Sequence, residues 1–361
     1  MISYQVIEHG KPLQKMVHET PKPKGTEVLV RITRSGVCHS DLHIWDGYFD
    51  WGGGRRFFVR DRGCIPPFTM GHEPFGVVEE LGSAVSRIDK KIRKGQKRIV
   101  FPWIGCGACP VCKDGLDNYC VAMRSLGVTR PGAYATHVLV PHPRYLVDAG
   151  GVDEAFAATL ACSGITAYSA ISKIPKLHAR DWVAVIGCGG VGLMAVSVLK
   201  AKGIRNVIAC DVDEGKLAAA KKLGAKLTLD TRAPDAPRKL QGLAGGYLAA
   251  AIDFVGMPAT AALGLGALRK GGRYVLCGLF GGELVHPLPP FAQRAIGIVG
   301  SYVGNLQELK EVVALAKNKK LKPTPVSTRP AGEVNAILED LKAGKVLGRV
   351  VLDLELELEQ K

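Results

Sequence analysis

The stretch that most constrains the fold of this chain lies near its middle, between Val183 and Asp211. It begins with a short apolar run, continues through the turn Gly187-Cys-Gly189-Gly190-Val191-Gly192 and a helical pattern of small apolar residues, and ends in a second apolar run. This order predicts a strand, a tight turn, a helix and a second strand parallel to the first. In such a unit the first glycine permits the turn, the second lets a pyrophosphate approach the backbone, and the third lets the helix pack on the strand.

The same unit predicts a dinucleotide cofactor, with a purely structural glycine turn as the alternative. The N-terminus of the helix offers unpaired N–H groups and the positive end of its dipole to phosphates. Asp211, at the end of the second strand, is expected to accept hydrogen bonds from the adenosine ribose and to repel a 2′-phosphate, which favours NAD over NADP. Lys216 is expected either to donate to the same ribose or to be a solvated helix residue.

Length and composition bound the remaining possibilities. A chain of 361 residues is long enough for two domains, and 47% hydrophobic residues with 44 glycines fit a soluble α/β protein. We expect no membrane span and no signal peptide, which places the protein in the cytoplasm and keeps its ten cysteines reduced. The formal net charge of +15 is dispersed along helical patterns, and no nucleic-acid-binding module is visible.

Strand and helix patterns on either side of the central unit predict two kinds of domain. The first 148 residues or so read mainly as short strands, for example 27–33 and 133–140. After Asp211, apolar runs at 250–255, 273–278 and 296–301 alternate with helical patterns, as a parallel sheet with helices on both faces requires. The last residues, Leu354–Lys361, are expected to form a frayed or tag-like end.

Four closely spaced cysteines give the strongest metal signal in the chain. They follow the pattern Cys106-x2-Cys109-x2-Cys112-x7-Cys120, with glycines and a proline shaping the loop. Four thiolates close a tetrahedral shell and leave no open position, which is typical of a structural zinc. Disulfides are disfavoured by the compartment, and the last spacing does not suit the usual iron–sulfur run.

A second metal site is only suggested by spacing. Cys38 and His72 each lie beside a turn glycine, and a thiolate and an imidazole suit a zinc ion that keeps one position open for catalysis. A free cysteine and a core histidine remain the alternative. Cys162, in a small-residue helical segment before the glycine turn, is a candidate third ligand from another segment.

Taken together, the motifs resemble the zinc-dependent medium-chain alcohol dehydrogenases, and the resemblance runs from about Val28 to Leu352. The matching segments occur in the family's order. They are Gly36-Val-Cys-His-Ser-Asp-Leu-His43, Gly71-His-Glu73, the cysteine quartet, Cys162-Ser-Gly-Ile-Thr-Ala-Tyr168, the glycine turn, Gly300-Ser-Tyr-Val-Gly-Asn305 and Gly348-Arg349.

The resemblance implies a fold, a set of boundaries and an assembly. A mostly β, partly open barrel of the GroES-like type is expected from residues 1–156 and 302–361, and an NAD-binding Rossmann domain from 157–301. The related enzymes of bacterial and yeast-like type imply a homotetramer.

The resemblance also assigns residues. It implies that Cys38, His72 and Cys162 hold a catalytic zinc, that Glu73 is a close neighbour and occasional ligand, and that Asp41 fixes the tautomer of His72. A proton relay would run from the alcohol through Ser40 and the nicotinamide ribose to His43. The remaining cofactor contacts are expected from the residues His39, Thr166, Gly278 and Arg349.

The segment Tyr48–Pro67 departs from the family, because it is longer than in the simple ethanol-oxidising members. One interpretation is a substrate entrance whose aromatic side chains accept a bulky or aromatic alcohol; these are Trp45, Tyr48, Trp51, Phe57 and Phe58. A second is an anion site formed by Arg55, Arg56, Arg60 and Arg62, and a third is a surface flap on a neighbouring subunit. Cys64 has no assigned role, and Cys188, Cys210 and Cys277 are expected to be buried spectators.

The expected function is NAD-dependent, zinc-assisted and reversible oxidation of primary alcohols, medium-chain or aromatic, to aldehydes. The alternative on the same scaffold is a dehydrogenase of a polyol or of an anionic or CoA-linked hydroxy substrate. From another class, a zinc-stabilised regulatory protein that senses NAD would leave the residues Ser40 and His43 idle, and the presence of both argues against it.

Overall fold

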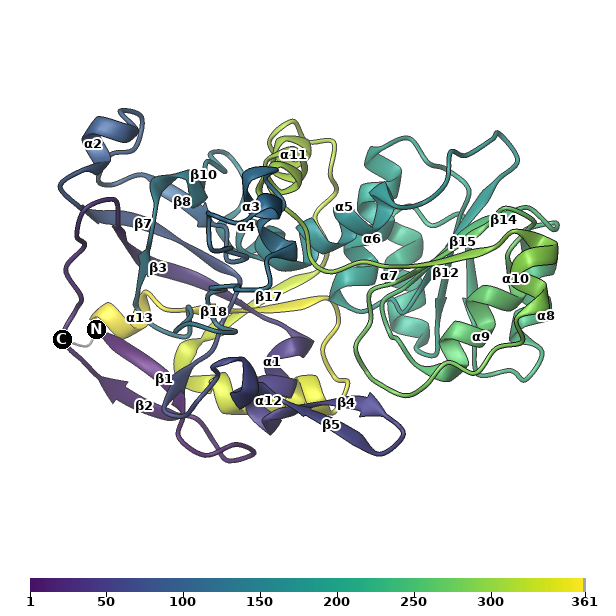
Figure 1. Cartoon of the computed structure of the whole chain (residues 1–361), viewed down its shortest axis with the longest axis horizontal. Coiled ribbons are helices and arrows are strands. Elements are labelled where there is room, and N and C mark those ends of the chain that lie inside the picture. The colour runs from purple at the N-terminus through teal and green to yellow at the C-terminus, as the bar shows by residue number, and fades with distance from the viewer. Residues whose placement is uncertain (360–361) are drawn as a thin grey trace.

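The computed structural model describes residues 1–359 and has two lobes side by side, a β-rich lobe and an α/β lobe (Figure 1). In the β-rich lobe the strands are β1 (Ile2–Val6), β2 (Gln14–Val17), β3 (Val28–Val37), β6 (Phe68–Thr69), β7 (Pro74–Leu81), β8 (Lys97–Val100), β9 (His137–Val140), β10 (Leu146–Val147), β17 (Val326–Pro330) and β18 (Arg349–Asp353). Its short helices before the α/β lobe are α1 (His39–Asp46), α2 (Val85–Ile88), α3 (Pro110–Lys113), η2 (Asp117–Tyr119) and η3 (Pro143–Tyr145).

The long strand β3 is the centre of the β-rich lobe. In the larger sheet the strand order is β10-β8-β7-β3-β18-β17, and β9 also pairs with β3. A second sheet has the order β2-β1-β6. Because β18 comes from the end of the chain and pairs antiparallel with β3, Val350 opposite Val37, the C-terminal segment completes the lobe in which the chain begins.

The α/β lobe is built on a parallel sheet with the strand order β13-β12-β11-β14-β15-β16. Its strands are β11 (Trp182–Ile186), β12 (Val207–Asp211), β13 (Leu227–Asp230), β14 (Leu248–Asp253), β15 (Arg273–Leu276) and β16 (Gly297–Gly300). The helices are α6 (Gly190–Ala201), α7 (Glu214–Leu223), α8 (Ala236–Leu243), α9 (Pro258–Ala267) and α10 (Pro289–Arg294).

This sheet confirms the α/β class predicted from the glycine turn. The central strand β14 is buried along its whole length, as expected for a parallel strand with helices on both faces. The glycine turn lies between β11 and α6, and the strand order reverses at β11 and β14, the place where such sheets bind ligands.

One continuous helical stretch joins the two lobes. It consists of α4 (Glu154–Thr159), the π-helical segment η4 (Leu160–Gly164) and α5 (Ile165–Ser172). By length and composition alone this stretch would pass for a membrane span, but 83% of its apolar window is buried inside the protein, as in a core helix. The π-helical turn carries Cys162 and brings it to the junction of the lobes.

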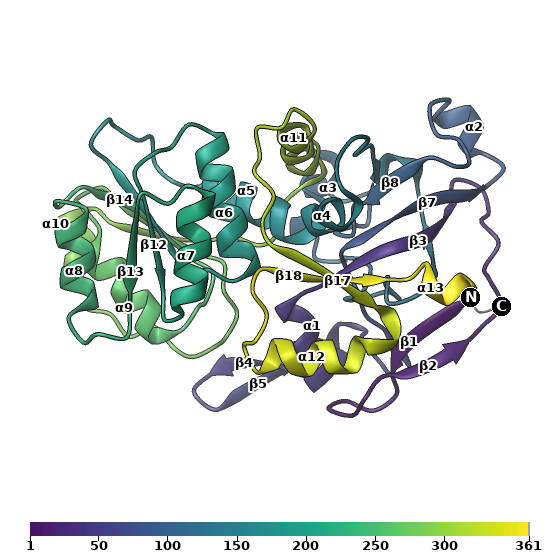
Figure 2. The same cartoon turned by 180° about the vertical axis from the view of Figure 1, so that it is seen from behind.

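The chain returns to the β-rich lobe through α11 (Leu306–Lys317), η5 (Ala331–Glu333) and α12 (Val334–Lys342), and ends in α13 (Leu356–Glu359). The expectation of a frayed end is wrong up to residue 359, and residues 360–361 lie outside the described part. Glu357 is 6% exposed and accepts a hydrogen bond of 2.7 Å from the Tyr4 hydroxyl, so α13 packs beside the N-terminal strand (Figure 2).

The segment Tyr48–Pro67, which reads as a loop, contains a β-hairpin. Strand β4 (Tyr48–Gly52) pairs antiparallel with β5 (Arg55–Phe58), and the 3-10 helix η1 (Val59–Arg62) follows. The turn needs glycine, since Gly52, Gly53 and Gly54 all have positive φ. The hairpin reaches toward the α/β lobe (Figure 1), where Arg55 forms a 3.1 Å ion pair with Glu283.

Candidate functional site

Four metal-ligating side chains come together where the lobes meet. Cys38 lies between β3 and α1, His72 and Glu73 precede β7, and Cys162 comes from η4. Their ligand atoms all lie within 4.8 Å of one another. The Sγ atoms of Cys38 and Cys162 are 3.9 Å apart. All four residues are buried.

The imidazole of His72 is oriented by Asp41. Its Nδ1 lies 3.1 Å from Asp41 Oδ1, whereas its Nε2 is buried and has no hydrogen-bond partner. Burial alone would lower the pKa of His72, but the Asp41 carboxylate outweighs it and raises the pKa to about 10. An unpartnered buried nitrogen costs free energy unless something binds it.

The pKa values of the two thiols, Cys38 and Cys162, shift in opposite directions. A hydrogen bond from the Cys162 thiol holds the pKa of Cys38 well below its usual value, and the same contact raises the pKa of Cys162. Two thiol sulfurs and the free Nε2 of His72, gathered in a buried position, fit a zinc ion with one position left open. The residues present therefore fit the metal that the resemblance implies.

Glu73 has a different partner. Its carboxylate forms a buried ion pair with Arg349 at the start of β18. The carboxylate lies directly over Gly36, where a Cβ atom would come within 1.9 Å of Glu73 Oε2. Glycine at position 36 is thus a steric requirement of the Glu73–Arg349 pair. This pair connects Arg349 to the metal set, the name used from here on for the ligand candidates Cys38, His72 and Cys162.

The cysteine quartet forms a second compact set, with the sulfurs of Cys106, Cys109, Cys112 and Cys120 within 4.8 Å of one another. Backbone N–H groups of Ala108 and Cys109 lower the pKa of Cys106 to about 6, which favours its thiolate. Burial raises the pKa of Cys112 to about 12. Four sulfurs in this arrangement fit a structural zinc with a closed shell.

The glycine turn opens onto a cleft of about 850 Å³. Its lining includes Gly187, Gly189, Gly190, Val191, Gly192, Asp211, Lys216 and Arg349. A Cβ on Gly192 would lie 1.8 Å from the carbonyl oxygen of Gly187, so only glycine lets α6 begin this close to the turn. The Asp211 carboxylate accepts backbone N–H bonds from Cys188 at 2.6 Å and Asp213 at 3.0 Å, which fix its position at the cleft.

A second cleft, of about 440 Å³, adjoins the first and has mainly apolar walls. The clefts share Cys38, His39, Val191, Phe254 and Phe280 as lining residues. The second cleft is also lined by Ser40, His43, Cys162, Thr166 and Gly278. Metal-ligating, relay and glycine-turn residues therefore surround one continuous space.

The two histidines of α1 are each covered by a phenylalanine. His43 stacks on Phe49 of β4 with ring centroids 4.5 Å apart, and His39 stacks on Phe280 at the same distance. Burial lowers the pKa of both histidines, which keeps them neutral at neutral pH. His43 Nε2 is buried without a partner, so it is available to exchange a proton.

Comparisons with known proteins find related families for both lobes. The family described as alcohol dehydrogenase GroES-like domain matches residues 24–149, and the zinc-binding dehydrogenase family matches 190–318. An NAD-dependent alcohol dehydrogenase of Sulfurisphaera tokodaii is 36% identical over 98% of this chain and 99% of its own length. The chain belongs to the zinc-dependent medium-chain alcohol dehydrogenase family.

Solved structures support the same placement. The alcohol dehydrogenase of Aeropyrum pernix superposes with a TM-score of 0.88 at 33% identity, over 98% of this chain and 100% of its own. An acetophenone reductase from Geotrichum candidum, solved in complex with NAD, superposes with a TM-score of 0.83 at 30% identity, over 98% of this chain and 96% of its own. The cofactors of this alcohol dehydrogenase family are zinc and NAD, as predicted.

The aromatic residues predicted to line the substrate cleft lie elsewhere in this family member. Trp45 is 4% exposed and its Nε1 donates to the carbonyl oxygen of Lys11 at 2.6 Å, so its indole fills the core. Trp51 stacks on Phe57 across the hairpin, and Tyr48 packs under Arg56. None of these four residues lines the second cleft. Strand alternation turns Tyr48 away from the side of β4 that carries Phe49, whereas Trp51 lies beyond the irregular pairing between Asp50 and Gly52.

The aromatic walls come instead from residues that the sequence patterns did not single out. Phe49 is the next residue after Tyr48, and the other aromatic lining residues are Trp103, Tyr119, Phe254, Phe280 and Tyr302. The period-two alternation of β4 is the one local signal that could have separated Phe49 from Tyr48. The others come from distant segments whose approach no local pattern encodes.

The hairpin arginines contact neighbouring side chains of the hairpin and of the α/β lobe, and none of them lines either cleft. Arg56, Arg60 and Arg62 stack over the rings of Tyr48, Phe58 and Phe57, while Arg55 pairs with Glu283. Cys64 is fully buried, and burial raises its pKa to about 12, so its thiol packs as a small apolar group. Cys188 and Cys210 are likewise buried, whereas Cys277 is half-buried at the cleft wall.

Proposed function

We propose that this protein oxidises primary alcohols, medium-chain or aromatic, to aldehydes with NAD as acceptor, and runs in reverse with NADH. The observation that carries the proposal is the continuous space formed by the two clefts. Cys38 and His39 line both of them, so a cofactor on the glycine turn and an alcohol at the metal set would lie side by side.

When bound, zinc supplies a Lewis acid for the alcohol oxygen, and NAD supplies the hydride acceptor. Cys38, Cys162 and His72 would hold the metal. Asp41 contacts Nδ1 of His72 and so leaves Nε2 as the nitrogen that would bind the metal. The glycine turn and Arg349 would hold the pyrophosphate, and Asp211 the adenosine ribose.

The protein must also take up the hydroxyl proton of the alcohol. Ser40 Oγ lies 3.8 Å from Cys38 Sγ, and Ser40 lines the second cleft together with Cys38 and Cys162, which would hold the metal. We propose that Ser40 accepts this proton at Oγ as it passes its own on, and that His43 holds the proton at Nε2 before release to solvent. The lowered pKa of His43 keeps it neutral and ready to accept.

The walls of the second cleft support an apolar alcohol. Phe49, Trp103 and Tyr302 offer flat surfaces suited to an aliphatic chain or an aromatic ring. Among the described residues that line this cleft there is neither a lysine nor an arginine. An anionic or CoA-linked substrate would therefore have no lysine or arginine partner within the cleft.

Initial rates of NADH formation across a panel test the substrate class. The panel should hold ethanol, hexanol, benzyl alcohol, a sorbitol-type polyol and a hydroxyacid. We expect the highest kcat/KM for hexanol or benzyl alcohol, because burial of each further methylene adds about 0.8 kcal/mol. Preference for the polyol or the hydroxyacid would contradict the proposed substrate class.

Two further proposals concern the setting of the enzyme. By likeness to its family we propose a homotetramer, which analytical ultracentrifugation of the purified chain tests. We also propose a cytoplasmic location, which keeps the thiols of both metal sets reduced.

A further inference from the structure

The Asp41 carboxylate behind the metal set is held by three donors. Its Oδ1 lies 3.1 Å from His72 Nδ1, and its Oδ2 accepts hydrogen bonds from the Cys38 backbone N–H at 2.9 Å and from the Tyr134 hydroxyl at 2.8 Å. Asp41, His72 and Tyr134 are all 0% exposed. Among residues 1–359, Tyr134 is thus the one side chain that donates to Asp41 Oδ2, the oxygen that His72 does not contact.

The ring of Tyr134 packs against the backbone that leads into His72. A Cβ on Gly71, whose φ is +96°, would lie 2.5 Å from Tyr134 Cδ1. The Tyr134 N–H donates to the Met70 carbonyl at 2.9 Å, and the Ala133 N–H donates to the Gly71 carbonyl at 2.8 Å. These contacts fix Met70 and Gly71, the two residues before His72. Tyr134 therefore acts on His72 in two ways, through its ring on the backbone and through its hydroxyl on Asp41.

The Tyr134 hydroxyl stays protonated and donates its hydrogen bond to Asp41. Burial and the neighbouring Asp41 charge raise the pKa of Tyr134 well above its usual value. A hydrogen bond to a buried carboxylate is among the stronger ones in proteins. Without it, Oδ2 of the fully buried Asp41 would keep only the Cys38 N–H as a donor among the described residues.

We infer that Tyr134 is a positioning residue for the metal set of Cys38, His72 and Cys162, acting through Asp41 and the Gly71 backbone. Tyr134 lines neither cleft and is not one of the metal-ligating side chains. By fixing Asp41 it fixes the tautomer and the ring plane of His72, and so the strength with which the metal is held. This inference rests on the proposed placement of the catalytic zinc.

The test is the rate at which zinc leaves Tyr134→Phe in the presence of an excess of a chromophoric chelator. Phenylalanine keeps the ring over Gly71 and removes only the hydroxyl. Wild-type protein should release two zinc ions per chain in two kinetic phases, one from the metal set and one from the cysteine quartet. A Cys112→Ser variant, which cannot hold the quartet zinc, should lack the second phase and so identifies it. We expect the phase of the Cys38 set to be about 10-fold faster in Tyr134→Phe, at the lower end of the effects of outer partners on metal sites, with the quartet phase unchanged.

Tyr274→Phe is the matched control. Tyr274 is 1% exposed and its hydroxyl also donates to a buried carboxylate, that of Asp253, but in the α/β lobe. Its removal should leave both zinc phases at the wild-type rate. Equal acceleration in both variants would indicate a general loss of stability and would overturn the role of Tyr134.

A double variant shows whether Tyr134 acts through Asp41. Asp41→Asn should itself speed zinc release, and Asp41→Asn/Tyr134→Phe should release zinc no faster than Asp41→Asn alone. Additive effects, or an unchanged rate in Tyr134→Phe, would overturn the inference while leaving the dehydrogenase proposal intact. A wild-type protein that binds zinc only at the quartet would overturn the proposed metal placement, and this inference with it.

Discussion

At the scale of residues, the site depends on a few side chains whose surroundings prepare them for one task. Helix α1 follows Cys38 directly, so a single element carries Asp41 toward the core and turns Ser40 and His43 toward the cleft. Successive residues of a helix point in different directions, which lets one short helix serve the metal set and the proton path at once.

Replacing Ser40 tests the proton path. In Ser40→Ala the hydroxyl proton of the alcohol loses its acceptor, so kcat should fall about 100-fold, as for other lost acid–base groups. The affinity for NAD, measured by fluorescence titration, should stay close to the wild-type value, because Ser40 is not among the residues lining the cofactor cleft.

Ser172→Ala is the control for this variant, because Ser172 is an exposed serine at the end of α5, remote from the lining of both clefts. Its kcat should equal that of the wild type. A Ser40→Ala enzyme with full turnover would show that the proton leaves by another route.

At the scale of elements, local patterns predicted what is encoded locally. The glycine turn and the cysteine quartet could be predicted because every residue they need lies within one short segment. The hairpin β4–β5 was missed although Gly52-Gly-Gly54 is a turn signal, because aromatic and arginine residues obscured the strand pattern. The C-terminal segment from Leu354 was wrongly predicted to be frayed, because the burial of Glu357 depends on Tyr4, which lies at the other end of the chain.

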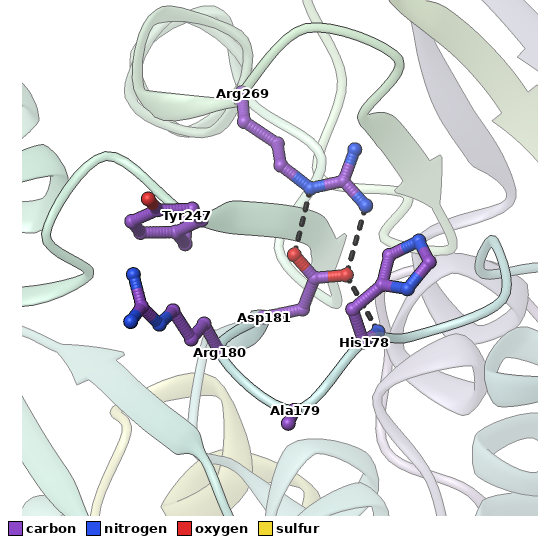
Figure 3. A pocket seen from close by; sticks show the side chains of 6 residues that line it. All are labelled: His178, Ala179, Arg180, Asp181, Tyr247 and Arg269. Carbon is purple, nitrogen blue, oxygen red and sulfur yellow. Dashed lines mark hydrogen bonds and ion pairs between the residues drawn. The ribbon is translucent and has the colours of Figure 1, made fainter.

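One ion pair at the base of the parallel sheet ties two elements of the α/β lobe together. Asp181, just before β11, accepts two hydrogen bonds of 2.8 Å from Arg269, which follows α9, and one of 2.8 Å from the His178 N–H (Figure 3). Burial alone would raise the pKa of Asp181, but Arg269 and the His178 N–H outweigh it and lower that pKa.

Arg269→Ala should therefore lower the free energy of unfolding by about 2 kcal/mol at pH 7, because it leaves a buried carboxylate poorly paired. The pKa of Asp181 is lower in the folded protein than in the unfolded chain, where it is about 3.9. The ion pair therefore stabilises the fold at a pH above the unfolded-state pKa. This stabilisation is lost as the pH falls through the folded-state pKa. In urea unfolding, the difference from wild type should be constant from neutral pH to about 5 and shrink below about 4.

Arg180→Ala is the matched control, since Arg180 lines the same hollow but is exposed (Figure 3). It should unfold like the wild type at every pH. A difference for Arg269→Ala that persists unchanged into acid would contradict the assigned role of the Asp181 charge.

At the scale of the whole molecule, the site is complete only where the lobes meet. The β-rich lobe supplies Cys38 and His72, the joining helix supplies Cys162, and the α/β lobe supplies the glycine turn. The sequence indicated these groups by their motifs, whereas the cleft walls and Tyr134 were not predicted, since Tyr134 lies 93 residues from the Asp41 that it holds. Contacts of that kind are set by packing, not by local pattern.

The most direct test of the account is the fate of the hydrogen on the alcohol carbon. Benzyl alcohol with both carbinol hydrogens replaced by deuterium should be incubated with NAD and zinc-loaded protein, and the NADH formed should be analysed by mass spectrometry. The account predicts NADH that carries one deuterium for each aldehyde formed, because hydride passes directly between neighbours in one cleft. Unlabelled NADH, or no NADH from a preparation that holds two zinc ions per chain and binds NAD, would contradict it.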